Sequence, residues 1–271
     1  MVPATHPVTL AGKRLVVIGG TTGLGFSAAR AFLAAGASGV VVTGRNVESA
    51  AEATHNLGPN AHALTGDAST PTHASEAIRL CVERLGGFDG LYHVAGGSGR
   101  RLGDGPLHEI TDDGIRQTLQ WNLDAVILSN RAAVRQFLVQ ETPGAILNMG
   151  SVLGWSPSPK YFSTHVYAAA KAGILGFTRS IAAYYAARSI RANVLAPALV
   201  ETPMAKRAAG NAEILEFIHT KQPLDGGRIG QPQDCDGAAV FLLSDAARFV
   251  TGQVLAVDGG WDVSEGQYPA S

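Results

Sequence analysis

Short apolar runs rich in Val, Ile and Leu alternate along this chain with segments whose apolar residues recur at the helical period. The runs predict strands and the segments between them predict helices. Strands are expected at residues 14–18, 39–43, 61–64, 90–94, 145–149, 191–195 and 254–257, and helices at 23–35, 47–57, 71–85, 112–139, 166–188 and 232–244. Continuous apolar runs are typical of parallel strands buried on both faces. The pattern therefore predicts an α/β fold, a doubly wound Rossmann fold with a seven-stranded parallel sheet flanked by helices.

Two long segments do not fit this alternation. Residues 96–110 are rich in Gly and Arg, and residues 197–230 contain only a short helical stretch near 212–219. Long loops of this kind usually cover a binding site. Because no repeat or composition shift marks a boundary, we expect residues 1–271 to form a single dinucleotide-binding and catalytic domain.

Composition narrows the classes of partner. The chain has 271 residues, 46% hydrophobic and 16% charged, with a net charge of −1 and the two signs interspersed. No basic patch is present for a nucleic acid or an anionic membrane, so we expect a small-molecule substrate. The first ten residues do not resemble a signal peptide, and Cys81 and Cys235 show no metal or redox spacing. These features predict a cytoplasmic protein with buried thiols and no metal site.

The first predicted strand runs directly into a glycine-rich turn and then a helix. In the sequence Gly19-Gly20-Thr21-Thr22-Gly23-Leu24-Gly25, the glycines permit a tight turn and a close approach of an anion to the backbone. Free N–H groups and the helix dipole attract a pyrophosphate at this place. The GxxxGxG spacing is one residue longer than the general GxGxxG fingerprint, and a glycine turn without a ligand is the alternative. The expected cofactor contacts are Gly19, Thr21, Thr22, Gly23, Leu24 and Gly25.

Arg45 follows the second strand, where a dinucleotide site normally places an acid that binds the ribose hydroxyls. A guanidinium can pair with a 2′-phosphate, which a carboxylate would repel. The sequence therefore favours NADP(H) over NAD(H), unless Arg45 is an exposed turn residue. Asp67, next to Ala68 after the third strand, could accept a hydrogen bond from the adenine amino group or cap the following helix.

Tyr167 and Lys171 lie four residues apart in a predicted helix, which places both side chains on one face. A phenol with a pKa near 10 is a poor general base at neutral pH. One positive charge at about 4 Å, in an effective dielectric near 20, contributes roughly 4 kcal/mol at most. We therefore expect Lys171 to lower the pKa of Tyr167, so that Tyr167 serves as the general acid and base.

Two further polar residues complete a candidate catalytic set. Ser151 follows the fifth strand, at the carboxyl edge where open α/β sheets bind ligands, and could bond the substrate oxygen. Asn122 lies in the middle of a predicted helix, where it would ordinarily point to water. A functional Asn122 could bend the helix and hold a water that reaches Lys171. Each of these polar residues alone could have a purely structural role. Their joint occurrence in this order after the glycine-rich loop favours a catalytic role.

These residues resemble the short-chain dehydrogenase/reductase family in its common form of about 250 residues, with 3-oxoacyl-acyl carrier protein reductase-like features. The resemblance covers residues 11–262. It rests on the glycine loop, Asn122, Ser151, Tyr167, Lys171, the run Asn193-Val194-Leu195-Ala196-Pro197 leading to Thr202, and Val257-Asp258-Gly259-Gly260.

The resemblance implies a role for each of these residues. Ser151 would orient the substrate oxygen, and Tyr167 would exchange its proton. Lys171 would lower the pKa of Tyr167 and bond the nicotinamide ribose. Thr202 and the backbone near Val200 would hold the carboxamide. A homotetramer, or a homodimer, is implied as well. Further cofactor contacts are expected at Ala95, Gly96 and Pro197.

The activity implied is an NADP(H)-dependent ketoreductase or alcohol dehydrogenase. The substrate could be a 3-oxoacyl thioester, a sugar or polyol, a cyclic ketone or a steroid. An NAD(H)-dependent dehydrogenase and a non-catalytic cofactor-binding regulatory protein are the alternatives.

The chain departs from the family pattern in several places. His93-Val94 stands where the family has two asparagines, Ala170 replaces a serine, and Ala198 replaces a glycine. The loop 155–165 is longer than usual, and we expect it to line the substrate pocket. That pocket is expected to include Trp155, His165, Leu199 and Met204, while Arg100, Arg101 and Lys160 either pair with a substrate anion or belong to a solvated loop.

Overall fold

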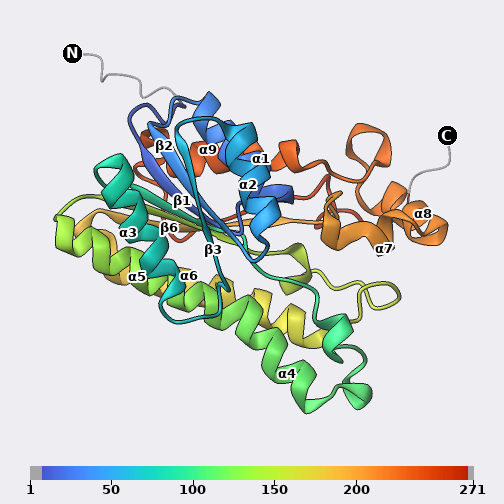
Figure 1. The fold of residues 1–271 in the computed structure, drawn as a ribbon. Coiled ribbons are helices and arrows are strands. Elements are labelled where there is room, and N and C mark those ends of the chain that lie inside the picture. The colour runs from blue at the N-terminus through green and yellow to red at the C-terminus, as the bar shows by residue number, and fades with distance from the viewer. Residues whose placement is uncertain (1–7, 268–271) are drawn as a thin grey trace.

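The computed structural model describes residues 8–267, and its centre is a twisted sheet of seven parallel strands (Figure 1). The strand order is β3-β2-β1-β4-β5-β6-β7, so the chain reverses its direction of winding between β1 and β4. Ligands bind at such a switch point, outside the carboxyl ends of the strands. The strands are β1 (Arg14–Ile18), β2 (Gly39–Gly44), β3 (Ala61–Thr65), β4 (Gly90–His93), β5 (Gly144–Met149), β6 (Ile190–Pro197) and β7 (Val254–Val257).

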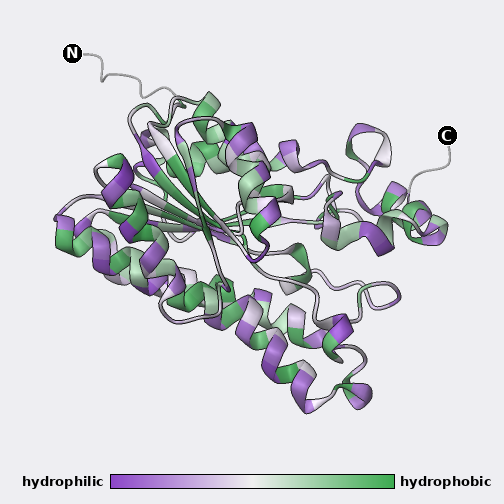
Figure 2. Ribbon diagram, viewed as in Figure 1, coloured by the Kyte–Doolittle hydropathy of each residue, from purple (hydrophilic) through white to green (hydrophobic). Residues whose placement is uncertain are grey.

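Helices cover both faces of the sheet, as the doubly wound prediction requires (Figure 1). One face carries α1 (Gly23–Ala34), α2 (Val47–Leu57) and α9 (Asp236–Leu243), and the other carries α3 (His73–Leu85), α5 (Ala125–Gln140) and α6 (His165–Tyr185). Hydrophilic residues lie mostly on the outer sides of the helices, with some apolar residues among them (Figure 2). Three more helices lie beyond the carboxyl end of the sheet: α4 (Asp112–Leu119), α7 (Lys206–Ala209) and α8 (Ala212–Lys221).

Apolar side chains fill the layer between the sheet and each set of helices. Phe32 and Tyr92 are buried in one layer, and Phe88 stacks on Phe137 in the other with ring centroids 4.7 Å apart. Because both faces are covered, strands such as β1 and β5 are apolar at consecutive positions. Cys81 and Cys235 are buried free thiols, which confirms the prediction for them.

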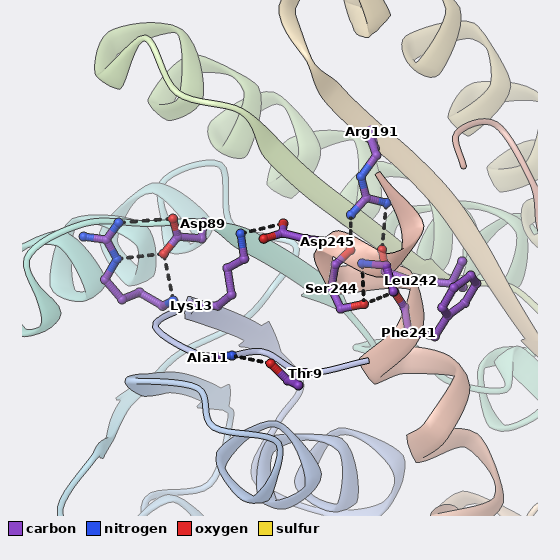
Figure 3. A network of polar contacts seen from close by, with 11 residues as sticks. Thr9, Ala11, Lys13, Asp89, Arg191, Phe241, Leu242, Ser244 and Asp245 are labelled. Atoms are coloured by element: carbon purple, nitrogen blue, oxygen red, sulfur yellow. Dashed lines mark hydrogen bonds and ion pairs between the residues drawn. The ribbon is translucent and has the colours of Figure 1, made fainter. Parts of the chain in front are cut away.

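Charged side chains join the strands at the amino edge of the sheet, opposite the expected site (Figure 3). Arg14 donates to both carboxylate oxygens of Asp89, at 2.7 and 3.1 Å, and Lys13 lies 2.8 Å from Asp245. Arg191 donates to the carbonyl oxygens of Leu242 and Ser244. Partly exposed pairs of this kind contribute about 1 kcal/mol or less each. These contacts connect the amino-terminal ends of the strands, on the side of the sheet opposite the expected active site.

The predicted strands agree with the structure to within two residues, and the predicted helices at 23–35, 47–57, 71–85 and 166–188 agree with α1, α2, α3 and α6 to within three. The first four residues of the predicted helix at 232–244 form the 3₁₀ helix Pro232–Cys235 that precedes α9. The predicted helix at 112–139 is wrong as a continuous α-helix, because a π-helical turn at Gln120–Asp124 separates α4 from α5. Such turns often occur at functional sites. No helix among residues 8–267 combines the length and the apolar character that crossing a membrane requires.

Candidate active site

The turn between β1 and α1 packs too closely for any residue but glycine at two of its positions. A Cβ at Gly19 would lie 2.6 Å from the backbone nitrogen of Ala95, and one at Gly25 would lie 2.1 Å from the carbonyl oxygen of Gly19. Gly20 donates to the carbonyl oxygen of Thr43 at 2.8 Å, which joins the turn to the end of β2. These glycines therefore press the turn against the ends of β2 and β4.

Gly23 begins α1 with φ +55, a left-handed conformation that favours glycine. The nearest atoms to a Cβ there would belong to Thr202 and Pro203, at 3.6 Å. The side chain of the N-cap residue Thr22 does not cap the helix, and the first turn contains no acidic residue. The N–H groups of this turn are thus suited to an anion.

Arg45 lies beyond the end of β2 with its guanidinium carbon 5.3 Å from the ring centroid of Trp121. This distance is within the range of a cation–π contact, which orients the guanidinium. Trp121 belongs to the π-helical turn, so the contact connects the β2 edge with that turn. Arg45 is exposed and contacts a side chain of another element, so its place in a cofactor site stays a prediction.

Asp67 makes a local turn after β3. Its carboxylate accepts hydrogen bonds from the backbone and hydroxyl of Ser69, both at 2.8 Å, while Thr72 occupies the N-cap of α3. The N-cap alternative for Asp67 is thus wrong. Partial burial opposes ionisation of Asp67, but the Ser69 hydrogen bonds and the nearby Arg45 charge lower its pKa below the ordinary value. Asp67 and Arg45 consequently form a charged edge beside the glycine turn.

Ser151, Tyr167 and Lys171 come together at the carboxyl end of β5. Lys171 donates to the carbonyl oxygen of Met149 at 2.8 Å, and its Nζ lies 5.5 Å from the centroid of the Tyr167 ring. The Ser151 hydroxyl is close enough to the Tyr167 hydroxyl to lower the pKa of that phenol, in opposition to burial. The spacing of four within α6 therefore places the phenol and the amine on one face, against the serine that follows the strand.

Burial dominates the protonation of this group. It raises the pKa of Tyr167 to about 12, against the opposing hydrogen bond from Ser151. Burial also lowers the pKa of Lys171 to about 8. The protein surroundings therefore keep the phenol protonated near neutral pH. The expectation that Lys171 lowers the pKa of Tyr167 is not met, because burial sets the direction of the shift and the opposing influence comes from Ser151.

Asn122 is fully buried in the π-helical turn, so an outward, solvated Asn122 is excluded. Its amide donates to the carbonyl oxygens of Gly97 and Thr118, at 2.9 and 3.0 Å, and accepts from the Gly97 N–H at 3.0 Å. A Cβ at Gly96 would lie 2.7 Å from the Asn122 side-chain oxygen and 3.8 Å from the Lys171 Nζ. The turn thus brings Asn122 beside Lys171 and the segment that follows β4.

The sequence did not identify Asp104 as part of this region. Its buried carboxylate accepts hydrogen bonds from the backbone N–H groups of Val166 and Tyr167, at 3.0 and 2.9 Å. It caps the start of α6, where the N-cap residue Thr164 makes no side-chain bond. Asp104 therefore fixes the backbone of Tyr167 from a distant loop, and no local sequence signal reveals this contact.

The four predicted substrate residues are divided between an apolar cluster and the surface. Trp155 and Leu199 pack at the cluster around Trp261, with Trp155 donating to Asp262 at 2.7 Å. Met204 is 55% exposed, and His165 is exposed at the start of α6. The contact of all four residues with a substrate stays a prediction.

His93 replaces an amide side chain of the family pattern and is fully buried at the end of β4. Its Nε2 lies 3.1 Å from the carbonyl oxygen of Ala95, and its Nδ1 lies 2.7 Å from the Ser129 hydroxyl. A carbonyl oxygen only accepts, so Nε2 carries the hydrogen and Nδ1 accepts from Ser129. Burial, with the Lys171 charge, lowers the pKa of His93 to about 3. The ring is therefore neutral and holds the segment that contains Ala95.

This arrangement predicts an acid-sensitive contribution to stability. Below pH 6.5 the unfolded chain binds a proton at His93 and the folded protein does not, so the free energy of unfolding falls as the pH falls. At about pH 4.5 the loss from this one group is roughly 2–3 kcal/mol. The test measures the free energy of unfolding in urea at pH 7 and at pH 4.5 for the wild-type protein and for His93→Asn. Between the two pH values, the free energy of His93→Asn should fall by less than that of the wild type, and the difference should be roughly 2–3 kcal/mol. An equal decrease in both proteins would show that His93 is not held neutral.

Comparison with known proteins shows which family has this fold and this candidate active site. A family model described as enoyl-(acyl carrier protein) reductase matches residues 19–262. The chain is 33% identical to a 2,5-dichloro-2,5-cyclohexadiene-1,4-diol dehydrogenase of Sphingobium indicum over 253 residues, which are 93% of this chain and 98% of the relative.

Solved structures are similar as well. A gluconate 5-dehydrogenase from Burkholderia cenocepacia, in complex with NADP and tartrate, has a TM-score of 0.84 and 31% identity, covering 94% of this chain and 96% of the other. A 3-ketoacyl-(acyl-carrier-protein) reductase from Brucella melitensis, complexed with NADH, has a TM-score of 0.82 and 25% identity, covering 94% and 100%. The family binds nicotinamide cofactors. The chain belongs to the short-chain dehydrogenase/reductase family, whose members are oxidoreductases that act on alcohol and carbonyl groups.

Proposed function

We propose that this protein is an NADP(H)-dependent oxidoreductase that interconverts a carbonyl and an alcohol, with Tyr167 transferring the proton. The nicotinamide, when bound, supplies or accepts the hydride. The observation that carries the proposal is the meeting of Ser151, Tyr167 and Lys171 at the carboxyl end of β5, on the sheet edge that carries the glycine turn. A protein without turnover has no physical need for a half-buried phenol beside a buried amine.

The protonation states suit the reductive direction. With a pKa of about 12, Tyr167 carries its proton at neutral pH and can donate it to a carbonyl oxygen. Ser151 can donate a second hydrogen bond to the same oxygen, which stabilises the developing negative charge. In the oxidative direction Tyr167 must lose a proton first. The charge of Lys171 and that of the oxidised cofactor would then favour the phenolate.

The preference for NADP(H) rests on Arg45. The segment after β2 offers a guanidinium beside Trp121 where an NAD(H) site would offer a carboxylate. The 2′-phosphate of NADP(H) can accept charge-assisted hydrogen bonds from it. The adenosine end would also contact Asp67 and Ala68. The remaining contacts would come from Gly19, Thr21, Thr22, Gly23, Leu24, Gly25, Ala95, Gly96, Tyr167, Lys171, Pro197, Val200 and Thr202.

Assembly and location complete the proposal. The outer faces of α5 and α6 expose Ile127, Val139 and Tyr184, at 37%, 79% and 78%. Apolar exposure on the two long helices supports a homotetramer built through them. The free thiols of Cys81 and Cys235 suit a reducing, cytoplasmic location.

A substrate panel with the purified protein tests the proposal. Oxidation of NADPH and of NADH is followed with 3-oxoacyl thioesters, sugars, cyclic ketones and steroid ketones. We expect turnover with at least one class and a higher kcat/KM for NADPH than for NADH. Cofactor binding without turnover of any compound would favour the regulatory alternative, and a preference for NADH would overturn the NADP(H) assignment.

A further inference from the structure

Two arginines from different loops meet at one backbone carbonyl. Arg100, in the 3₁₀ helix Gly99–Leu102, and Arg207, in α7, both donate to the carbonyl oxygen of Tyr161, with nitrogen–oxygen distances of 3.5 and 3.2 Å. The three residues lie in the loops that follow β4, β6 and β5. Because these strands are neighbours, the loops extend from the sheet edge that carries Ser151 and Lys171 (Figure 1).

Neither arginine of this pair has an ion-pair partner in the described part of the chain. Within residues 8–267, no carboxylate lies within 4.0 Å of either guanidinium. Glu213 is committed elsewhere, since it pairs with Lys160 at 2.6 Å and accepts from the Tyr161 hydroxyl at 3.2 Å. Partial burial and then the Arg100 charge lower the pKa of Arg207 below its ordinary value. Both guanidinium groups thus donate to the neutral carbonyl oxygen of Tyr161, although their positive charges repel each other.

Aromatic packing anchors the carbonyl that holds them. The Tyr161 ring lies 5.0 Å from the ring of Phe217, and Phe217 packs edge-on against Trp261 at 5.6 Å. Phe162 packs on the same Trp261 ring at 5.8 Å, and Trp261 is buried. The arginine pair therefore lies at the rim of an apolar, aromatic cluster.

The loop of Arg100 is also fastened to the residue that we propose transfers the proton. The backbone N–H of Asp104 donates to the carbonyl oxygen of Gly99 at 3.0 Å, and the Asp104 carboxylate binds the Tyr167 N–H. The position of Arg100 is therefore set relative to the start of α6. A group bound by the pair would be held at a defined place with respect to Tyr167.

We propose that Arg100 and Arg207 bind a carboxylate of the substrate, so that the enzyme acts on a keto acid or hydroxy acid with an apolar body. The proposal rests on the proposed function of the same site. Each guanidinium has five N–H donors, of which the Tyr161 carbonyl occupies one. A carboxylate can accept the others in paired geometry and relieve the repulsion. Arg100, Arg101 and Arg207 are all exposed, but only Arg100 and Arg207 converge on the Tyr161 carbonyl, and Lys160 is paired with Glu213.

Matched probes test this assignment in the wild-type enzyme. The probes are a cyclohexanone with a carboxylate opposite the ketone, the corresponding carboxamide and the corresponding phosphate ester. We expect kcat/KM for the acid to exceed that for the amide by about 10- to 100-fold. Equal rates for the acid and the amide would overturn the proposal, and a preference for the phosphate would overturn the choice of carboxylate.

Variants separate binding from folding. Arg100→Gln and Arg207→Gln should each lower kcat/KM for the acid about tenfold and leave the amide within about twofold. Arg116→Gln removes the same charge from α4, where the guanidinium pairs with Asp113, and should change neither value. Equal losses for the acid and the amide in Arg100→Gln and Arg207→Gln would mean that the pair only supports the loops.

Binding of the carboxylate probe to the wild-type protein is measured by titration calorimetry, which tests the carboxylate site independently of turnover. If no probe is reduced, acid binding that Arg207→Gln abolishes would still support the carboxylate site. Absence of acid binding would overturn it.

Discussion

Tyr167→Phe should fold, still bind NADPH, and lose nearly all turnover. The substitution removes one hydroxyl from a phenol whose pKa burial raises to about 12, and with it the proton that the carbonyl oxygen receives. General acid catalysis by a positioned group contributes about 10²- to 10⁴-fold to the rate. We therefore expect kcat to fall by at least about 100-fold in steady-state NADPH oxidation.

Tyr184→Phe is the matched control for this loss. Tyr184 lies on the same helix, α6, but its side chain is 78% exposed. The same chemical change there keeps the ring on the proposed subunit interface and removes only a hydroxyl far from the sheet edge, so kcat should stay within about twofold. If Tyr167→Phe kept more than about half of the wild-type kcat, another group would have to transfer the proton.

Arg45→Asp should change the choice of cofactor. The guanidinium lies over Trp121 at the edge where a 2′-phosphate would bind, and a carboxylate there would repel the phosphate. Losing a charge-assisted hydrogen bond costs about 1.5–3 kcal/mol, so the dissociation constant for NADPH should rise about 10- to 100-fold. NADH lacks the phosphate, so its dissociation constant should change little or decrease.

The control for Arg45→Asp is Arg84→Asp, an equal change of charge on the last turn of α3, where the side chain is exposed. Both cofactors are titrated against each variant by fluorescence. Arg84→Asp should leave both dissociation constants unchanged. An equal weakening of NADPH and NADH in Arg45→Asp would remove Arg45 from the 2′-phosphate site.

The sheet could be predicted from the sequence because its signal is local and repeated. Runs such as Val16-Val17-Ile18 and Val40-Val41-Val42 are apolar at every position, which only a strand buried on both faces tolerates at that length. The spacing of Tyr167 and Lys171 is likewise a local property of a helix. Their approach to Ser151 followed from the rule that ligands bind at the carboxyl edge.

The remaining features depend on contacts between distant segments. Asn122 is buried because a π-helical turn rotates it inwards to Gly97, and helix propensity does not encode that rotation. Asp104 reaches the start of α6 across more than 60 residues of sequence. Arg207 meets Arg100 only because β4 and β6 are both neighbours of β5. The periodicity and spacing of residues along the chain do not reveal such contacts between distant segments.

A crystal structure of the protein with NADP⁺ and the best alcohol of the panel tests the central claim most directly. The distances from the substrate oxygen to the hydroxyl oxygens of Tyr167 and Ser151 decide it. We predict that both lie within about 2.6–3.2 Å, with the reacting carbon facing the nicotinamide. A substrate oxygen bound elsewhere, with Tyr167 out of hydrogen-bond reach, would contradict the assignment of Tyr167 as the proton donor.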